Sequence, residues 1–231
     1  MILNFISEFI SGDSPLYLLL IKTLFSIVAL LLVFPVHECA HGLMALALGD
    51  ETAKHQGRLT LNPLSHVDLH GFLFLLVLGF GWAKPVQIDP RFFKNRRLGT
   101  ILVSAAGPLS NVIFCFITYL IYGILSTYAA TNGIEWLWLF SMLFLYMALY
   151  NATFAVFNLI PFPPLDGSKI LGELLPVRLR FRFYRLEQYS FIFFFVLILI
   201  LNRTGIIGFL SSGLMALFTP IVNAILGGIF G

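Results

Sequence analysis

Long apolar runs separated by short polar segments dominate this sequence. A helix of about 20 mostly apolar residues is long enough to cross a bilayer. The first run follows the helix-start signal Asp13-Ser14-Pro15 and continues helically to about Leu48, where Gly49-Asp50 end it. Four later runs predict further spans, over residues 99–125, 136–160, 188–201 and 205–229. Residues 1–12 are too short to span and predict an interfacial helix.

The segment between the first two spans, residues 54–97, has a different character. It contains turn signals and two β-friendly runs, G-R-L-T-L-N-P-L and G-F-G-W-A-K-P-V-Q-I. The apolar run between them, F-L-F-L-L-V-L, is too short to span and predicts a strand or a re-entrant segment.

Composition supports a membrane protein of one domain. Hydrophobic residues make up 59% of the 231 residues and charged residues only 11%, whereas soluble domains carry about a quarter charged residues. The net charge of +3 is too small to indicate a nucleic-acid partner. Cys39 and Cys115 both lie in apolar stretches, so no disulfide framework is expected. The N-terminus lacks a basic start and a small-residue cleavage site, so we expect no removed signal peptide.

Basic residues predict the orientation of the spans. Seven of the 14 Lys/Arg lie in residues 54–97, none in 126–135 and only Arg203 in 202–204. Five more follow the third span: Lys169, Arg178, Arg180, Arg182 and Arg185. The positive-inside rule makes the basic segments cytoplasmic, so five spans would put the N-terminus outside and the C-terminus inside. A site for an anionic substrate is a less favoured explanation of the same residues.

The strongest motif is H-E-C-A-H, residues 37–41, inside the first predicted span. Residues four apart share one face of a helix, so His37 and His41 can bind one zinc ion. Glu38 lies between them, where it can take a proton from bound water and pass it to a leaving amine. Two histidines with purely structural partners are the alternative, but ionisable residues in an apolar span are costly and usually functional.

A catalytic zinc site needs a third protein ligand. Of the 11 acidic residues, only Glu38 and Asp166 lie in or against predicted spans and away from loops and termini. His37 lies about 22 residues after Pro15, or roughly 33 Å of helix rise, which puts the metal toward the cytoplasmic side. Asp166 follows a span that runs in the same direction and therefore reaches a similar depth. We expect Asp166 to complete the ligand set; capping of the short helix that begins at Gly167 is its alternative role.

Several motifs together give the sequence a family resemblance. H-E-C-A-H is followed by G-P-L-S-N (Gly107 to Asn111) and later by N-L-I-P-F-P-P-L-D-G (Asn158 to Gly167). The run N-P-L-S-H-V-D, residues 62–68, is similar to the segment after the zinc helix in small members of the same family. In this order the motifs resemble the site-2 proteases, which are intramembrane zinc metalloproteases, over about residues 30–175.

The resemblance implies a three-helix core in which His37, His41 and Asp166 bind one Zn²⁺ per chain and Glu38 is the general base. The chain is too short for the PDZ or CBS regulatory domains that many relatives carry, so regulation by such modules is not expected.

The resemblance also implies a substrate-binding surface. It assigns Asn111 a catalytic contact with the substrate backbone or transition state, and Asn158 a substrate-binding contact. An amide near zinc can stabilise an oxyanion, although both asparagines could instead hydrogen bond across packed helices. It further implies that residues 56–90 form a small membrane-associated β-structure that receives an unwound substrate by β-augmentation.

The remaining polar features of this segment are less informative. His66 and His70 are expected to be surface or turn residues rather than ligands, because three ligands are already assigned. Gly79 and Gly81, with Trp82, predict a bend at the membrane interface.

We therefore predict an all-α polytopic membrane protein with about five transmembrane helices and a small membrane-associated β-structure between the first two. The expected single domain covers 1–231, with a core at about 15–175 and C-terminal helices over 188–229. The expected location is a bacterial or archaeal cell membrane, with the active site toward the cytoplasm.

The predicted function is hydrolysis of peptide bonds in or near transmembrane segments of membrane-protein substrates. The expected partners are a transmembrane-helix substrate and the lipid bilayer, with no nucleic acid; a homo-oligomer stays open. One alternative is a membrane zinc protease acting on soluble or lipidated peptides, as in the CaaX-processing type, although that type uses a Glu in a later helix as ligand. Another is a catalytically silent zinc-binding scaffold or a transporter. The presence of Glu38, which metal binding does not need, argues against a scaffold, and a transporter should show two similar halves.

Overall fold

The structure is a computed structural model, and it describes residues 15–78 and 83–230. The interfacial helix expected over residues 1–12 and the bend expected at Gly79, Gly81 and Trp82 lie outside the described residues.

Four helices in the described part of the chain are long and apolar enough to cross a membrane. They are α2 (Leu16–Ala47), α5 (Arg96–Asn132), α6 (Glu135–Asn158) and α10 (Ile206–Phe230). The span predicted over 188–201 corresponds to α9 (Ser190–Thr204), which has only 15 residues. A helix of that length rises about 22 Å, less than the roughly 30 Å of a bilayer core. The described residues thus contain four candidate spans, one fewer than the five predicted.

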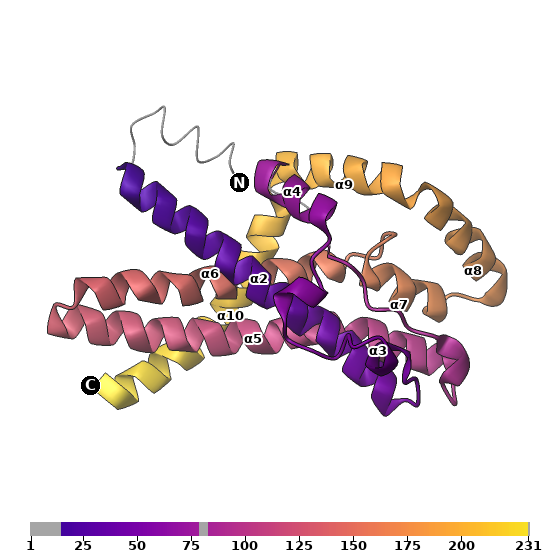
Figure 1. The fold of residues 1–231 in the computed structure, drawn as a ribbon, viewed down its shortest axis with the longest axis horizontal. Coiled ribbons are helices and arrows are strands. Elements are labelled where there is room, and N and C mark those ends of the chain that lie inside the picture. Colours follow the sequence, from indigo (N-terminus) through magenta and orange to yellow (C-terminus); the bar gives the residue numbers. More distant parts are fainter. Residues whose placement is uncertain (1–14, 79–82, 231) are drawn as a thin grey trace.

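Helices α2, α5 and α6 pack together as the core of the molecule (Figure 1). Asn95 caps the start of α5 by accepting a hydrogen bond from the N–H of Leu98 (3.1 Å). Gly133 ends α5 in the left-handed conformation, with φ of +67°, and α6 begins two residues later. Small residues at the α5–α6–α10 contact, among them the fully buried Ala148 and Ala152, let these helices approach closely.

Side-chain contacts fix the direction of α10. Phe116 of α5 packs on Phe218 of α10 with ring centroids 5.3 Å apart, and the hydroxyls of Tyr119 and Thr219 lie 3.4 Å apart. Residue numbers rise together along both helices, so α10 runs parallel to α5. Helix α2 runs antiparallel to α5, and the start of α2 and the C-terminus therefore lie at one end of the α5–α6 pair, on the left of Figure 1. This arrangement differs from the five-span prediction, which puts the two ends of the chain on opposite sides of the membrane.

The described part of the segment between α2 and α5 forms no sheet. It contains α3 (Thr52–His55), the 3₁₀ turns η1 (Pro63–Ser65) and η2 (Pro90–Phe92), and helix α4 (Leu69–Leu78), which takes up the apolar run. Within the described residues, pairing is limited to an isolated antiparallel bridge between Val67 and Ala83. The β-structure predicted over 56–90 is therefore not supported.

Beyond the bridge at Ala83, where the N–H of Lys84 donates to the carbonyl oxygen of His66 at 2.8 Å, side chains hold the extended residues 83–89. The guanidinium of Arg58 donates to the carbonyl oxygens of Lys84 and Pro85, both at 3.1 Å. The carboxylate of Asp50 accepts from the N–H of Asp89 at 2.7 Å. Because Pro85 has no N–H to give to a neighbouring strand, a regular ladder is disfavoured here.

After α6 the chain turns back at its proline-rich loop. Short helices α7 (Asp166–Leu174) and α8 (Val177–Tyr184) and the 3₁₀ turn η3 (Arg185–Tyr189) then lead to α9. Helix α7 packs against α5, which brings its first residue to the middle of the helical core.

Candidate metal centre

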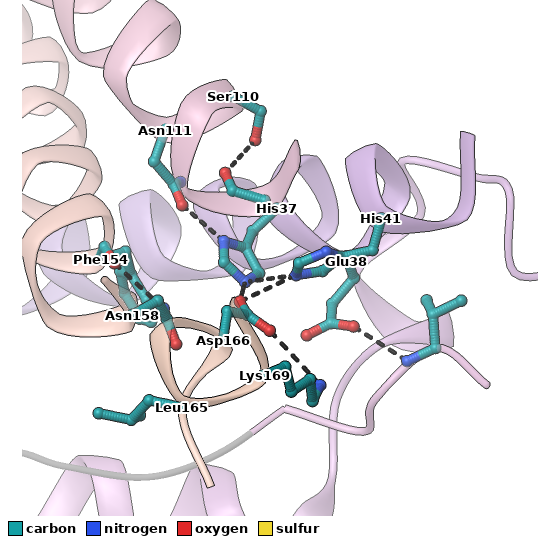
Figure 2. A network of polar contacts seen from close by, with 12 residues as sticks. His37, Glu38, His41, Ser110, Asn111, Phe154, Asn158, Leu165, Asp166 and Lys169 are labelled. Carbon is teal, nitrogen blue, oxygen red and sulfur yellow. Dashed lines mark hydrogen bonds and ion pairs between the residues drawn. The ribbon is translucent and has the colours of Figure 1, made fainter. Parts of the chain in front are cut away.

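Three buried side chains from two distant parts of the chain meet beside α5 (Figure 2). The Nε2 atoms of His37 and His41 lie 3.1 Å apart. The Oδ2 atom of Asp166 lies 3.3 Å from Nε2 of His37 and 3.1 Å from Nε2 of His41. The two histidines are one helical turn apart on α2, and Asp166 is the first residue of α7.

Hydrogen bonds on the far side of each ring orient both histidines. The Nδ1 of His37 lies 2.6 Å from Oδ1 of Asn111, and the Nδ1 of His41 lies 2.7 Å from the carbonyl oxygen of Val103. Both partners are acceptors, so each Nδ1 carries the proton and each Nε2 presents a lone pair. Metal-binding histidines are usually oriented in this way.

The spacing and chemistry of the three atoms fit a zinc ion. Ligands about 2.0–2.2 Å from a tetrahedral zinc lie roughly 3.3 Å from one another, close to the separations found here. Two imidazoles and one carboxylate also leave a fourth position for water or substrate, as in catalytic rather than structural zinc sites.

The environment of Asp166 favours its charged form. Burial acts to raise the pKa of Asp166, but hydrogen bonds from His37 and His41, made when their Nε2 atoms also carry a proton, outweigh burial and hold that pKa well below its usual range. The ammonium of Lys169, 3.5 Å from the other carboxylate oxygen, acts in the same direction. The side chain is therefore ready to bind a cation.

Glu38 lies beside this cluster without joining it. Its Oε2 accepts a hydrogen bond from the backbone N–H of Val86 at 3.0 Å, and the carboxylate lies next to His41 in Figure 2. The extended segment 83–89 thus holds the half-buried Glu38 beside the metal centre.

Asn111 is buried among helices and uses both ends of its amide. Its oxygen faces His37, and its Nδ2 donates to Oδ1 of Asn151 on α6 at 2.8 Å. Asn151 in turn donates to the carbonyl oxygen of Met147 at 2.9 Å. These contacts orient a metal-binding histidine; the contact with substrate that the resemblance implied stays a prediction.

Asn151 was missed by the sequence reasoning. An amide in the middle of the apolar run 136–160, about two turns before Asn158, is a detectable signal, because polar groups inside a membrane need partners. The sequence alone does not reveal that the partner of Asn151 is Asn111 on α5.

Asn158 lies at the end of α6, near Asp166 (Figure 2). Its Nδ2 donates to the carbonyl oxygen of Phe154 at 3.1 Å, one turn earlier in the same helix. Its predicted substrate contact is likewise untested.

The structure places neither His66 nor His70 in the metal centre. His66 is a buried turn residue that hydrogen bonds to the carbonyl oxygen of Thr60 at 2.8 Å. His70 is exposed on α4.

Gly107 lets α5 pass directly against the metal ligands. A Cβ at this position would overlap Nε2 of His41 and would lie 2.6 Å from Cε1 of His37. Both atoms belong to rings fixed by hydrogen bonds, so neither can move away at low cost.

We expect Gly107→Ala to lower zinc affinity by about 10–100-fold, the range typical of changes to groups that orient metal ligands. The test is the zinc content of the purified protein after dialysis against a graded series of chelator concentrations. Gly123→Ala is the matched control in the same helix, because its Cβ would meet only side chains of Leu226 and Val222, at 3.0 and 3.1 Å. Equal zinc retention by the two variants would contradict the prediction.

Comparisons with known proteins agree with this geometry. The model of peptidase family M50 matches residues 25–201, and the chain belongs to this family. The chain is 42% identical over 189 residues to "Putative zinc metalloprotease YwhC" of Bacillus subtilis (strain 168), covering 80% of this chain and 84% of that protein. It is 27% identical over 176 residues to "Putative zinc metalloprotease Rip2" of Mycolicibacterium smegmatis, covering 72% of this chain and 64% of that protein. No solved structure matches the chain.

These findings confirm the resemblance to site-2 proteases and the expectation of a zinc ion. With the four apolar helices, they make the protein a membrane zinc metalloprotease of the M50 family.

Proposed function

We propose that the protein hydrolyses peptide bonds in or near the transmembrane segments of other membrane proteins. The observation that carries this proposal is the position of the metal centre. His37 and His41 belong to α2, a helix apolar enough to span the bilayer, and they are buried beneath α5. A substrate bond must therefore reach the zinc at membrane depth.

The proposed roles of the residues follow from their contacts. When bound, zinc supplies a Lewis acid that activates water and polarises the scissile carbonyl. Glu38 accepts the proton of the attacking water and later gives it to the leaving amine. Asn111 and Val103 keep the two imidazoles in the required tautomer and orientation.

The metal centre lies toward one end of its helix. His37 is about 21 residues past the start of α2, or roughly 32 Å of rise. Segments 54–58, 84–97 and 169–185, which carry twelve Lys/Arg, lie toward that same end of α5 (Figure 1), and the positive-inside rule assigns it to the cytoplasm. We propose that the active site faces the cytoplasmic side of a bacterial or archaeal cell membrane.

This orientation can be tested by labelling single introduced cysteines from either side of the membrane. Reporters at Arg96 and Arg180 should react from the cytoplasm, and reporters at Asn132 and Gly228 from outside. Gly228 decides between four and five spans, because five alternating spans would make it cytoplasmic; nothing lies within 4 Å of a Cβ placed there. The native thiols are buried and should give little background.

The substrate type can be tested with purified protein in proteoliposomes. One substrate has a transmembrane helix weakened by Gly and Pro near the zinc depth, and a second has the same helix rebuilt with leucine. We expect the first to be cut and the second to be cut poorly, because lipid offers no water to replace intrahelical hydrogen bonds. Cleavage of a soluble peptide with the same target residues at an equal rate would favour the alternative, a membrane protease for soluble or lipidated peptides.

A further inference from the structure

A basic cavity of about 810 Å³ lies between the start of α5 and helices α7 and α8, apart from the metal centre. Four positively charged side chains line it: Lys94, Arg96, Arg97 and Arg180. Glu173 is the one acidic residue of the lining. The lining therefore carries three more positive than negative charges.

The acidic residue of the cavity is already engaged. Glu173 accepts from Arg180 (2.9 Å) and from the hydroxyl of Tyr184 (2.9 Å). Arg97 and Arg180 also donate to the backbone carbonyl oxygens of Leu174 and Glu173, at 3.1 and 3.2 Å. These bonds fix two guanidinium groups in place around the end of α7, and they leave no carboxylate for the other cations.

Lys94 and Arg96 are exposed, and neither forms a hydrogen bond or ion pair with any described residue. Asp89 is near enough to Arg96 to interact electrostatically, but the carboxylate of Asp89 forms its ion pair with Arg91, at 2.6 Å. Hydrogen bonds from the side chain and backbone of Arg91 lower the pKa of Asp89 to about 2. The cavity thus holds two cations fixed by hydrogen bonds, of which Arg180 is paired with Glu173, and two cations that form no ion pair with a described residue.

The location of the cavity identifies the kind of anion that fits. It lies at the end of α5 that the basic residues assign to the cytoplasmic surface, where lipid headgroups are. Basic residues of the lining are followed in sequence by exposed apolar side chains, such as Leu98 (52% exposed) and Phe181 (68% exposed). Exposed apolar side chains can contact the acyl chains of a lipid, whereas they contribute nothing to the binding of a free inorganic ion.

The geometry points to a binding site for the phosphate headgroup of an anionic phospholipid in this cavity. Basic pockets between helices at the cytoplasmic surface bind such headgroups in other membrane proteins. Lys94 and Arg96 supply the unpaired charges, while Arg97 and Arg180 line the site and hold the end of α7. The lipid assignment rests on the proposed orientation of the protein in the membrane, but not on the proposed proteolysis.

The test is isothermal titration calorimetry, in which short-chain phosphatidylglycerol is added to the detergent-solubilised full chain. Short-chain phosphatidylcholine and inorganic phosphate are titrated in parallel. The double variant Lys94→Gln/Arg96→Gln removes the two unpaired charges. The control Arg178→Gln/Arg182→Gln removes two exposed charges of α8 that lie outside the lining.

We expect phosphatidylglycerol to bind more tightly than either alternative ligand. Each basic residue near an anionic lipid contributes about 1 kcal/mol, or about five-fold in affinity, so the cavity variant should bind on the order of 25-fold more weakly. The control should bind nearly as the wild type does. Equal weakening in the two double variants would show diffuse surface attraction and overturn the site. Inorganic phosphate binding as tightly as phosphatidylglycerol would show a site for soluble anions and overturn the lipid assignment.

Discussion

Replacing Glu38 by Gln should reduce cleavage of a transmembrane substrate by about 10²–10⁴-fold, the usual cost of losing a general base. Gln has nearly the same shape, and its amide oxygen can still accept the hydrogen bond from Val86 N–H. It cannot accept a proton from the attacking water. The fold and the zinc content should therefore stay at their wild-type values.

The measurement is the initial rate of cleavage in proteoliposomes, with zinc content determined on the same preparation. Glu51→Gln is a suitable control, since Glu51 is an exposed acid beyond the end of α2. Undiminished cleavage by the Glu38 variant would contradict the proposed mechanism, whatever the zinc content of the variant. Loss of both zinc and activity would show that Glu38 is needed to build the site, which its position outside the ligand cluster does not predict.

Replacing Asp166 by Ala should weaken zinc binding by at least about 10²-fold, more than a change to a supporting group. The variant loses one of three protein ligands and leaves the two Nε2 atoms without their anionic partner. Wild-type protein should hold about one zinc ion per chain. The measurement is metal content by mass spectrometry after dialysis against chelator.

The control variant Lys169→Gln distinguishes the loss of a metal ligand from a change in the charge beside it. It removes the cation 3.5 Å from Asp166 but leaves the carboxylate in place. Its zinc content should stay close to that of the wild type. Full zinc occupancy in Asp166→Ala would remove this residue from the ligand set.

The residues that meet at the metal centre were predictable, because each carries a strong local signal. Ionisable groups in an apolar sequence are few, and the depth reached by each span allows only some of them to meet. The features that were missed depend on three-dimensional packing. Asn151 has its partner on another helix, and the clearance at Gly107 is visible only when α5 lies against α2.

The membrane topology was predicted less well for related reasons. An apolar run of 14 residues, 188–201, does not reveal whether its helix crosses the bilayer or lies against other helices. Phe194 in this helix packs on Phe157 at the end of α6, with ring centroids 6.2 Å apart. The described parts of the β-friendly runs in 56–90 form no sheet, and Arg58 and Asp50 satisfy part of the backbone that strands would otherwise use.

The parallel course of α5 and α10 has a practical consequence for labelled forms of the protein. The start of α2 and the end of α10 emerge on the face remote from His41 and Asp166. A fluorescent protein or affinity handle fused at the C-terminus would project away from the catalytic opening and leave the approach of a substrate clear.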